Sequence, residues 1–254
     1  MLAKLPKSFK FKSAKDLNRI GRNNDGGYLV SYNDIINSDL LIGLGISDDW
    51  SFEQEFSNIK KITILAYDGS ISKKKLIRQS KKLLKEFKIS RALKKYITYV
   101  KFKSFFEQKS NHFTRKYVGF DKSHTIPEGY ITLDSILKDQ VDKNIFLKID
   151  IEGDEYQLLD TLIKYQNNIS GVTIEFHNCD SHLPSIERFI NDFKLNIIHI
   201  HANNYADITD GCLPPVIEVT FSKYSQSSGK TELPHKLDMP NNKKNPDIKL
   251  IIEE

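Results

Sequence analysis

The chain has 254 residues, of which 39% are hydrophobic and 28% charged, with a net charge of +5; this is the composition of a water-soluble globular protein with one sizeable core. Its two cysteines, Cys179 and Cys212, exclude a disulfide framework and favour a reducing compartment. The N-terminus has no apolar signal segment, and no apolar run approaches the about 20 residues of a membrane span, so we expect a cytoplasmic protein without a membrane span.

Apolar runs alternate with helix-like segments along the chain, which is the pattern of an α/β protein with a largely parallel sheet. Strands are expected at Leu40–Leu44, Ile62–Tyr67, Ile97–Phe102, Ile145–Ile149, Val172–Phe176, Leu195–Ile200 and Val216–Phe221. Helices are expected at Trp50–Asn58, Ser72–Lys95, Thr132–Lys138, Tyr156–Tyr165 and Leu183–Phe193. A loop rich in Asn, Asp, Gly and Pro separates the last two strands, which allows the final strand to run antiparallel.

Composition divides the chain into three segments. We expect residues 1–24 to form an N-terminal lead-in and residues 25–222 to form the core domain. Residues 223–254 are rich in Ser, Gly, Lys, Pro and Asn, a composition that favours extended chain over helix. We therefore predict an extended C-terminal tail packed on the core.

The positive charge is concentrated in one segment. Residues 73–103 carry thirteen Lys and Arg against a single acid, Glu86, which gives +12 and leaves −7 for the rest of the chain. Apolar residues recur in this segment at near-helical spacing, so an amphipathic helix with a solvated lysine face accounts for it. The alternative is a surface for an anionic partner: a phosphorylated or nucleotide-linked substrate, a membrane surface or nucleic acid. We do not expect nucleic acid, because no recognition motif or aromatic interleaving accompanies the lysines.

The first candidate site follows the first predicted strand, where Gly43 and Gly45 precede Ser47. Glycines at a strand end let the backbone turn tightly and approach a ligand closely. The third glycine of the dinucleotide fingerprint is missing, which weakens a nicotinamide interpretation. Asp68 ends the second strand, 23 residues after Gly45, and it either accepts hydrogen bonds from the ribose hydroxyls of an adenosine ligand or simply caps the next turn. We expect Gly43, Gly45, Ser47 and Asp68 to bind a cofactor that contains adenosine.

The most informative stretch runs from Ile145 to Glu155, where an apolar strand leads directly into four acids. The helix dipole favours acids at the start of a helix, which accounts for Asp154 and Glu155 but not for Asp150 at the strand end. His177 ends the next predicted strand, and His201 ends a later one. Because neighbouring strands lie about 5 Å apart, Asp150 and His177 are able to converge if their strands pair.

Thr132–Leu137, followed by Leu147–Glu155, resembles the signature of the FkbM family of methyltransferases, with Gly43, Gly45 and Asp68 upstream. The resemblance covers about residues 25–221. It implies a Rossmann-like seven-stranded sheet, mostly parallel with an antiparallel last strand and with helices on both faces. It also implies an O-methyltransferase that uses S-adenosyl-L-methionine, often on sugars, glycans or secondary metabolites.

For such an enzyme we expect a small-molecule or glycan-linked acceptor, with an anionic acceptor such as a phosphorylated or nucleotide-linked one left open, in a pathway such as surface polysaccharide biosynthesis. Asp150, His177 and His201 are the expected catalytic residues. Either His177 acts as a general base, or Asp150 and His177 hold Mg or Mn. His201 would be a third ligand only if the last strands bring it close enough. A nicotinamide-dependent oxidoreductase and a non-catalytic binding module that uses the basic segment remain alternatives. The sequence does not indicate an oligomeric state.

Overall fold

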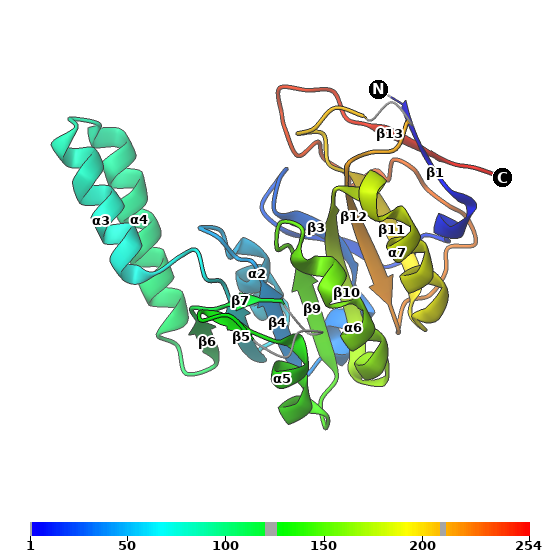
Figure 1. The fold of residues 1–254 in the computed structure, drawn as a ribbon, viewed down its shortest axis with the longest axis horizontal. Helices are drawn as coiled ribbons and strands as arrows, with labels where there is room; N and C mark the ends of the chain where they lie inside the picture. The colour runs from blue at the N-terminus through cyan, green and yellow to red at the C-terminus, as the bar shows by residue number, and fades with distance from the viewer. Residues whose placement is uncertain (1, 120–125, 209–211) are drawn as a thin grey trace.

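A seven-stranded sheet forms the centre of the computed structural model, which describes residues 2–119, 126–208 and 212–254 (Figure 1). In spatial order the strands are β11 (Asn196–Ala202), β12 (Val216–Ser222), β10 (Ile169–His177), β9 (Ile145–Ile149), β4 (Leu40–Leu44), β5 (Thr63–Tyr67) and β6 (Asn111–Thr114). β12 runs antiparallel to both of its neighbours, and the pairs from β10 to β6 are parallel. The predicted Rossmann-like sheet with an antiparallel last strand is confirmed.

The strand order reverses between β4 and β9. From β4 the chain adds β5 and β6 on one side of the sheet, and from β9 it adds β10 on the other. β4 and β9 are buried along their whole length, which explains why their sequences are uninterrupted apolar runs. In open α/β sheets the crevice at such a reversal, outside the carboxyl ends of the strands, is where ligands bind.

Helices cover both faces of the sheet (Figure 1). One face packs against α2 (Ser51–Ile59), the first turns of α3 (Lys73–Lys85) and the last turns of α4 (Ile89–Phe106). The core between them includes Phe56, Leu76 and Phe102. The other face packs against α5 (Leu133–Leu137), α6 (Leu159–Tyr165) and α7 (Cys179–Asp192) through a core that includes Leu133, Leu159 and Phe189. In the part of the chain that the structure describes, the remaining helices are α1 (Tyr32–Asn37) and the short 3-10 turns Lys7–Phe9, Lys138–Gln140, Asp154–Gln157 and Gln166–Asn168.

Three two-stranded sheets complete the fold of the described residues. β2 (Leu17–Gly21) and β3 (Gly27–Ser31) form a hairpin whose turn contains the predicted boundary at residue 24. β1 (Leu2–Leu5) pairs with β13 (Lys249–Ile252), so the two ends of the chain lie together, and β7 (Tyr117–Val118) pairs with β8 (Tyr130–Ile131). No helix in the described part of the chain combines the length and the apolar character that crossing a bilayer requires.

The basic segment differs from the prediction. Ile97–Phe102, expected as a strand, lies inside helix α4, and the single helix expected over Ser72–Lys95 is instead two helices that form a projecting hairpin (Figure 1). The β-branched and aromatic residues of this run favour a strand only weakly, and tertiary packing overrides that preference. Phe102 sits edge-on to Trp50, with ring centroids 5.4 Å apart. The third parallel strand is β6, a four-residue segment too short and polar to stand out.

Candidate functional site

Three strand ends meet at the reversal of the sheet, and Gly45 makes their close approach possible. Gly45 follows β4 with a φ of +75°, and a Cβ there would lie 1.7 Å from the carbonyl oxygen of Asp150. The N–H of Asp150 in turn donates to the carbonyl of Leu44 at 3.1 Å. The close contact between the ends of β4 and β9 therefore requires a glycine at position 45. Gly43 faces the buried Glu53, where a Cβ would lie 2.3 Å from its Oε1.

Asp68 ties the glycine loop to the turn after β5. Its Oδ2 accepts from the N–H of Ser47 at 2.7 Å, and its Oδ1 accepts from the N–H groups of Ser70 and Ile71 at 2.6 and 3.2 Å. The carboxylate is buried, yet Oδ2 keeps room for one further donor, because each carboxylate oxygen accepts two hydrogen bonds. Both roles considered for Asp68, a turn cap and a ligand acceptor, are thus compatible.

A cavity of about 300 Å³ lies between the glycine loop and β7. Its walls combine apolar and aromatic surface with acids at the strand ends: Gly45, Ser47, Tyr67, Asp68, Ser70, Lys116, Tyr117, Val118, Asp150, Ile151, Glu152 and Asp154. It contains three of the four predicted cofactor-binding residues, and Gly43 does not line it. We call it the donor cavity, because these residues are the ones predicted to bind the methyl-donating cofactor.

A second cavity, of about 470 Å³, shares Gly45, Ser47, Asp150 and Glu152 with the donor cavity and extends toward β10. Seven carboxylates line it, namely Asp25, Asp48, Asp49, Glu53, Asp150, Glu152 and Glu175, against the two cations Arg22 and Lys148 and one histidine, His177. Burial raises the pKa of Glu53 to about 7. We call this the acidic cavity.

The structure brings together Asp150, Glu152 and His177. One side-chain ligand atom from each lies within 4.8 Å of the other two. Carboxylate oxygens and an imidazole nitrogen are ligands that Mg, Mn and related divalent cations accept. The chemistry of this donor set fits a divalent cation. Asp150 and His177 were predicted, whereas Glu152 was assigned no role, because its position depends on the turn it begins, with a φ of +57°.

His177 is held in place by Glu155, a buried carboxylate that lines neither cavity. Glu155 Oε1 accepts from the backbone N–H of His177 at 2.6 Å and lies 3.2 Å from His177 Nδ1, and its Oε2 accepts from the N–H of Gly153 at 2.9 Å. With Nδ1 occupied, Nε2 faces Glu152 and Glu175 at 3.6 and 3.9 Å. Burial lowers the pKa of His177, but Glu155, Glu175 and Asp150 outweigh it and raise that pKa to about 9.

A buried polar network forms the floor of the acidic cavity. Tyr28 donates from its hydroxyl to Glu175 Oε2 at 2.9 Å, with Asp150 Oδ2 at 3.3 Å, and Asn203 donates to Glu175 Oε1 at 2.8 Å. Lys148 donates to the Gly45 carbonyl at 2.8 Å and to Asp150 Oδ2 at 3.2 Å. Burial raises the pKa of Tyr28 well above its usual value, so the phenol stays a donor. Sequence reasoning missed this network, because its members come from four separate elements.

His201 is not brought to this cluster. It lies on β11, which β12 separates from β10. Its Nδ1 lies 3.3 Å from Glu218 Oε2 and its Nε2 lies 3.2 Å from Asp247 Oδ1. Burial lowers the pKa of His201, but Asp247 and Glu218 raise it to about 10. Its observed contacts fasten the C-terminal segment to the sheet.

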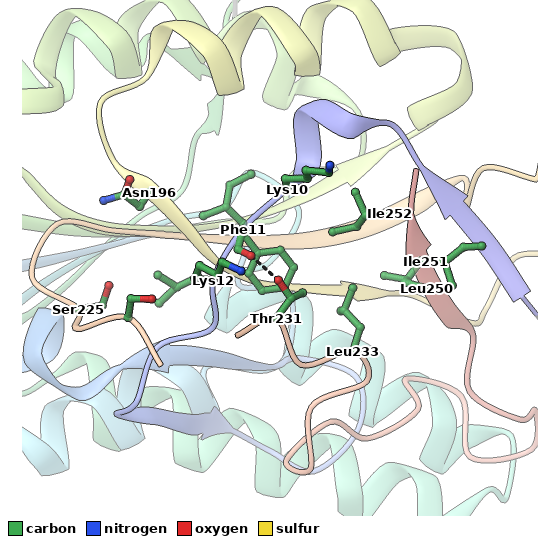
Figure 2. Close-up of a pocket in the computed structure, with 13 residues that line it drawn as sticks. Lys10, Phe11, Lys12, Asn196, Ser225, Thr231, Leu233, Leu250, Ile251 and Ile252 are labelled. Atoms are coloured by element: carbon green, nitrogen blue, oxygen red, sulfur yellow. Dashed lines mark hydrogen bonds between the residues drawn. The ribbon is translucent and has the colours of Figure 1, made fainter. Parts of the chain in front are cut away.

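The most voluminous of the described cavities, about 900 Å³, lies elsewhere, at the amino end of β11 (Figure 2). Phe11, Leu233, Leu250 and Ile252 give it an apolar lining, and Thr231 donates a hydrogen bond to the Phe11 carbonyl. Its lining contains no histidine, cysteine or acid. The convergent polar groups that mark a catalytic site are at the carboxyl ends of the strands instead.

The sequence matches the family described as "Methyltransferase FkbM domain" over residues 78–224. No protein of curated function matches it. An rRNA methylase from Streptococcus thermophilus shares 11% identity, with 75% of this chain and 92% of that chain covered and a TM-score of 0.39. A precorrin-6y methyltransferase from Geobacter metallireducens shares 14%, with 74% and 81% covered and a TM-score of 0.35. Both solved structures are thus only distantly similar to this chain.

Proposed function

The chain belongs to the FkbM methyltransferase family, and we propose that it transfers the methyl group of S-adenosylmethionine to a hydroxyl oxygen of a small or glycan-linked acceptor. One observation carries the proposal beyond methyl transfer in general. Asp150, Glu152 and His177 converge where the donor cavity meets the acidic cavity. A methyl group delivered from one cavity would therefore meet an acceptor held in the other.

We assign the adenosine part of the methyl donor to the donor cavity. The open acceptor position on Asp68 Oδ2 suits a ribose hydroxyl, and Tyr67, Tyr117 and Val118 supply apolar surface. Because Gly45 has no side chain, the ends of β4 and β9 approach closely at the junction with the acidic cavity. The sulfonium carries a positive charge, which the carboxylates at this junction stabilise.

The acceptor oxygen attacks the methyl carbon in line with its bond to sulfur. The carbon–oxygen bond forms as the carbon–sulfur bond breaks, the electron pair stays on sulfur, and the hydroxyl proton leaves to water, or to His177 in the fraction of the protein in which its ring is neutral. A divalent cation held by Asp150, Glu152 and His177 would lower the pKa of the acceptor hydroxyl and orient its oxygen. Glu155 fixes the ring so that Nε2 points to the reacting atoms, as carboxylates do for metal-binding histidines.

The charge of the acidic cavity restricts the chemical class of acceptor that it would bind. Burial raises the pKa of Glu53 to about 7 and of Glu175 to about 8, and the pKa of His177 is raised to about 9, so at neutral pH five ionised carboxylates face three cations. The remaining excess of negative charge repels a phosphate at this point. An uncharged hydroxyl, such as that of a sugar, is compatible with the lining. Any phosphate or nucleotide of a linked acceptor would then lie outside the acidic cavity. A sugar acceptor agrees with a role in surface polysaccharide modification.

Calorimetry tests the proposal without knowledge of the acceptor. The chain should bind S-adenosylhomocysteine at one site and should not bind a nicotinamide dinucleotide. His177→Ala and Asp150→Asn should keep that affinity within about threefold while weakening Mn binding about 100-fold or more. With an acceptor in hand, the same variants should lower kcat about 100-fold. Tight Mn binding by both variants would exclude the cation site, and full activity in EDTA would leave His177 as a general base.

A further inference from the structure

The hairpin of α3 and α4 carries an apolar surface that the fold does not cover. Among the described residues fifteen large hydrophobic side chains are exposed, and seven of them lie between residues 84 and 100: Leu84, Phe87, Ile89, Leu93, Tyr96, Ile97 and Val100. Those on α4 recur every three or four residues, so they form one stripe along the helix. An exposed apolar surface of this kind marks an interaction site.

Phe87 is the most exposed residue of this apolar surface. It sits in the turn between the two helices with a φ of +58°, a conformation that bulky residues rarely adopt. The positive φ belongs to the end of α3, where the N–H of Phe87 donates to the Leu84 carbonyl at 3.0 Å. The residue is 90% exposed, so packing of the side chain within the fold does not explain why a large apolar residue stands at this position. Leu84 and Ile89 flank it at 58% and 65% exposure. The hairpin projects from the sheet (Figure 1), and its tip carries these three exposed apolar side chains.

Positive charge surrounds this apolar tip. Lys81, Lys82, Lys85, Lys88 and Arg91 lie within two turns of it. Glu86 is the only acid between residues 73 and 103, and it pairs with Lys88 at 2.7 Å. Lys81 and Lys85 form no ion pair with any described residue, and both line a groove along α3 with Lys74, Arg78 and Lys82. The groove thus offers anionic groups several unpaired cations.

We propose that this hairpin docks the protein on an anionic lipid bilayer, with Leu84, Phe87 and Ile89 inserted among the acyl chains and the lysines on the headgroup phosphates. Helices with apolar and basic surfaces of this kind lie in the interface plane of membranes, and basic residues beside them attract anionic headgroups. A second copy fits poorly, because α4 carries five basic residues and no acid, so two such helices would repel. An RNA duplex would pair with the lysines but leave the apolar tip in water.

One ion pair links the hairpin to the body of the protein, and one hydrogen bond joins its two helices. Lys95 Nζ lies 2.5 Å from Asp48 Oδ2, and Asp48 lines the acidic cavity. Ser80 donates to the Ala92 carbonyl at 2.9 Å and joins the two helices. The ion pair therefore connects α4 to a residue that lines the acidic cavity. Membrane docking does not depend on the proposed methyl transfer and is measured separately from it.

Sedimentation with sucrose-loaded vesicles tests the docking on the full chain. We expect binding to vesicles of phosphatidylcholine with 30% phosphatidylglycerol, weak binding to phosphatidylcholine alone, and loss of binding at high salt because exposed charges are screened. Replacing Lys81, Lys82 and Lys85 with Glu should reduce partitioning about 100-fold. Replacing Lys236, Lys243 and Lys244 with Glu makes the same change in net charge at exposed sites outside the hairpin, and it should have little effect.

The apolar tip has its own test. Phe87→Ser should weaken binding about tenfold, whereas Val141→Ser, at another exposed apolar site, should not. Phe87→Trp should show a blue-shifted emission on anionic vesicles against the constant background of the buried Trp50. Circular dichroism checks that each variant is folded. Equal binding by the hairpin and control variants would overturn the proposal. No binding to anionic vesicles would also overturn it. In that case self-association in sedimentation velocity would indicate a second copy on this surface, and retention of an RNA duplex would indicate RNA.

Discussion

Glu155→Gln probes the site at a residue that cannot touch a ligand. The carboxylate accepts three hydrogen bonds, from the backbone and ring of His177 and from Gly153. The amide that replaces it has one accepting oxygen, so at least one buried donor loses its partner and the charge-assisted character of the others is lost. We expect the free energy of unfolding to fall by about 2 kcal/mol, which urea denaturation measures.

The larger effect should be on the cation. Once Nδ1 is no longer held by a carboxylate, the ring of His177 is free to reorient and is less basic, and such a loss weakens metal affinity about 10- to 100-fold. Calorimetry with Mn should show this loss, while S-adenosylhomocysteine should bind as in the wild type. Asp160→Asn removes one negative charge at an exposed site, where Arg188 is the partner, and serves as the control. Unchanged Mn affinity in a folded Glu155→Gln variant would refute the positioning role.

Three further predictions concern the glycine loop and the core. Asp68→Asn should weaken S-adenosylhomocysteine binding by about 1–3 kcal/mol in calorimetry, and normal affinity would remove Asp68 from the donor cavity. Gly45→Ala should lower the free energy of unfolding by roughly 2–4 kcal/mol, because its Cβ meets the Asp150 carbonyl at a positive φ; an unchanged urea midpoint would show that the loop relaxes. Burial raises the pKa of Asp34 from 3.8 to about 7. Folding then favours the protonated acid, so stability should fall as the pH rises from 4 to 8 through this group. Asp34→Asn should flatten that part of the stability curve by roughly 2–4 kcal/mol, and an identical slope in the variant would contradict the shift.

The sequence by itself determined the centre of the fold. β4 and β9 occupy the predicted ranges Leu40–Leu44 and Ile145–Ile149, because a strand buried on both faces needs an uninterrupted apolar run. The same rule placed Asp150 and His177 at the ends of paired strands, and the structure brings them together. Periodicity failed for Ile97–Phe102, since a short run of β-branched and aromatic residues fits a strand and a helix face equally well.

Only the tertiary structure decided which other residues join the site. The turn at Glu152 and Gly153, both with positive φ, returns the chain so that Glu155 reaches His177, and no spacing rule reports that reversal. The insertion of β12 between β10 and β11 carries His201 away from the cluster, although its sequence position resembles that of His177. Strand-end residues are fixed by local burial, but their neighbours depend on strand order and turn geometry, which arise from packing across the whole chain.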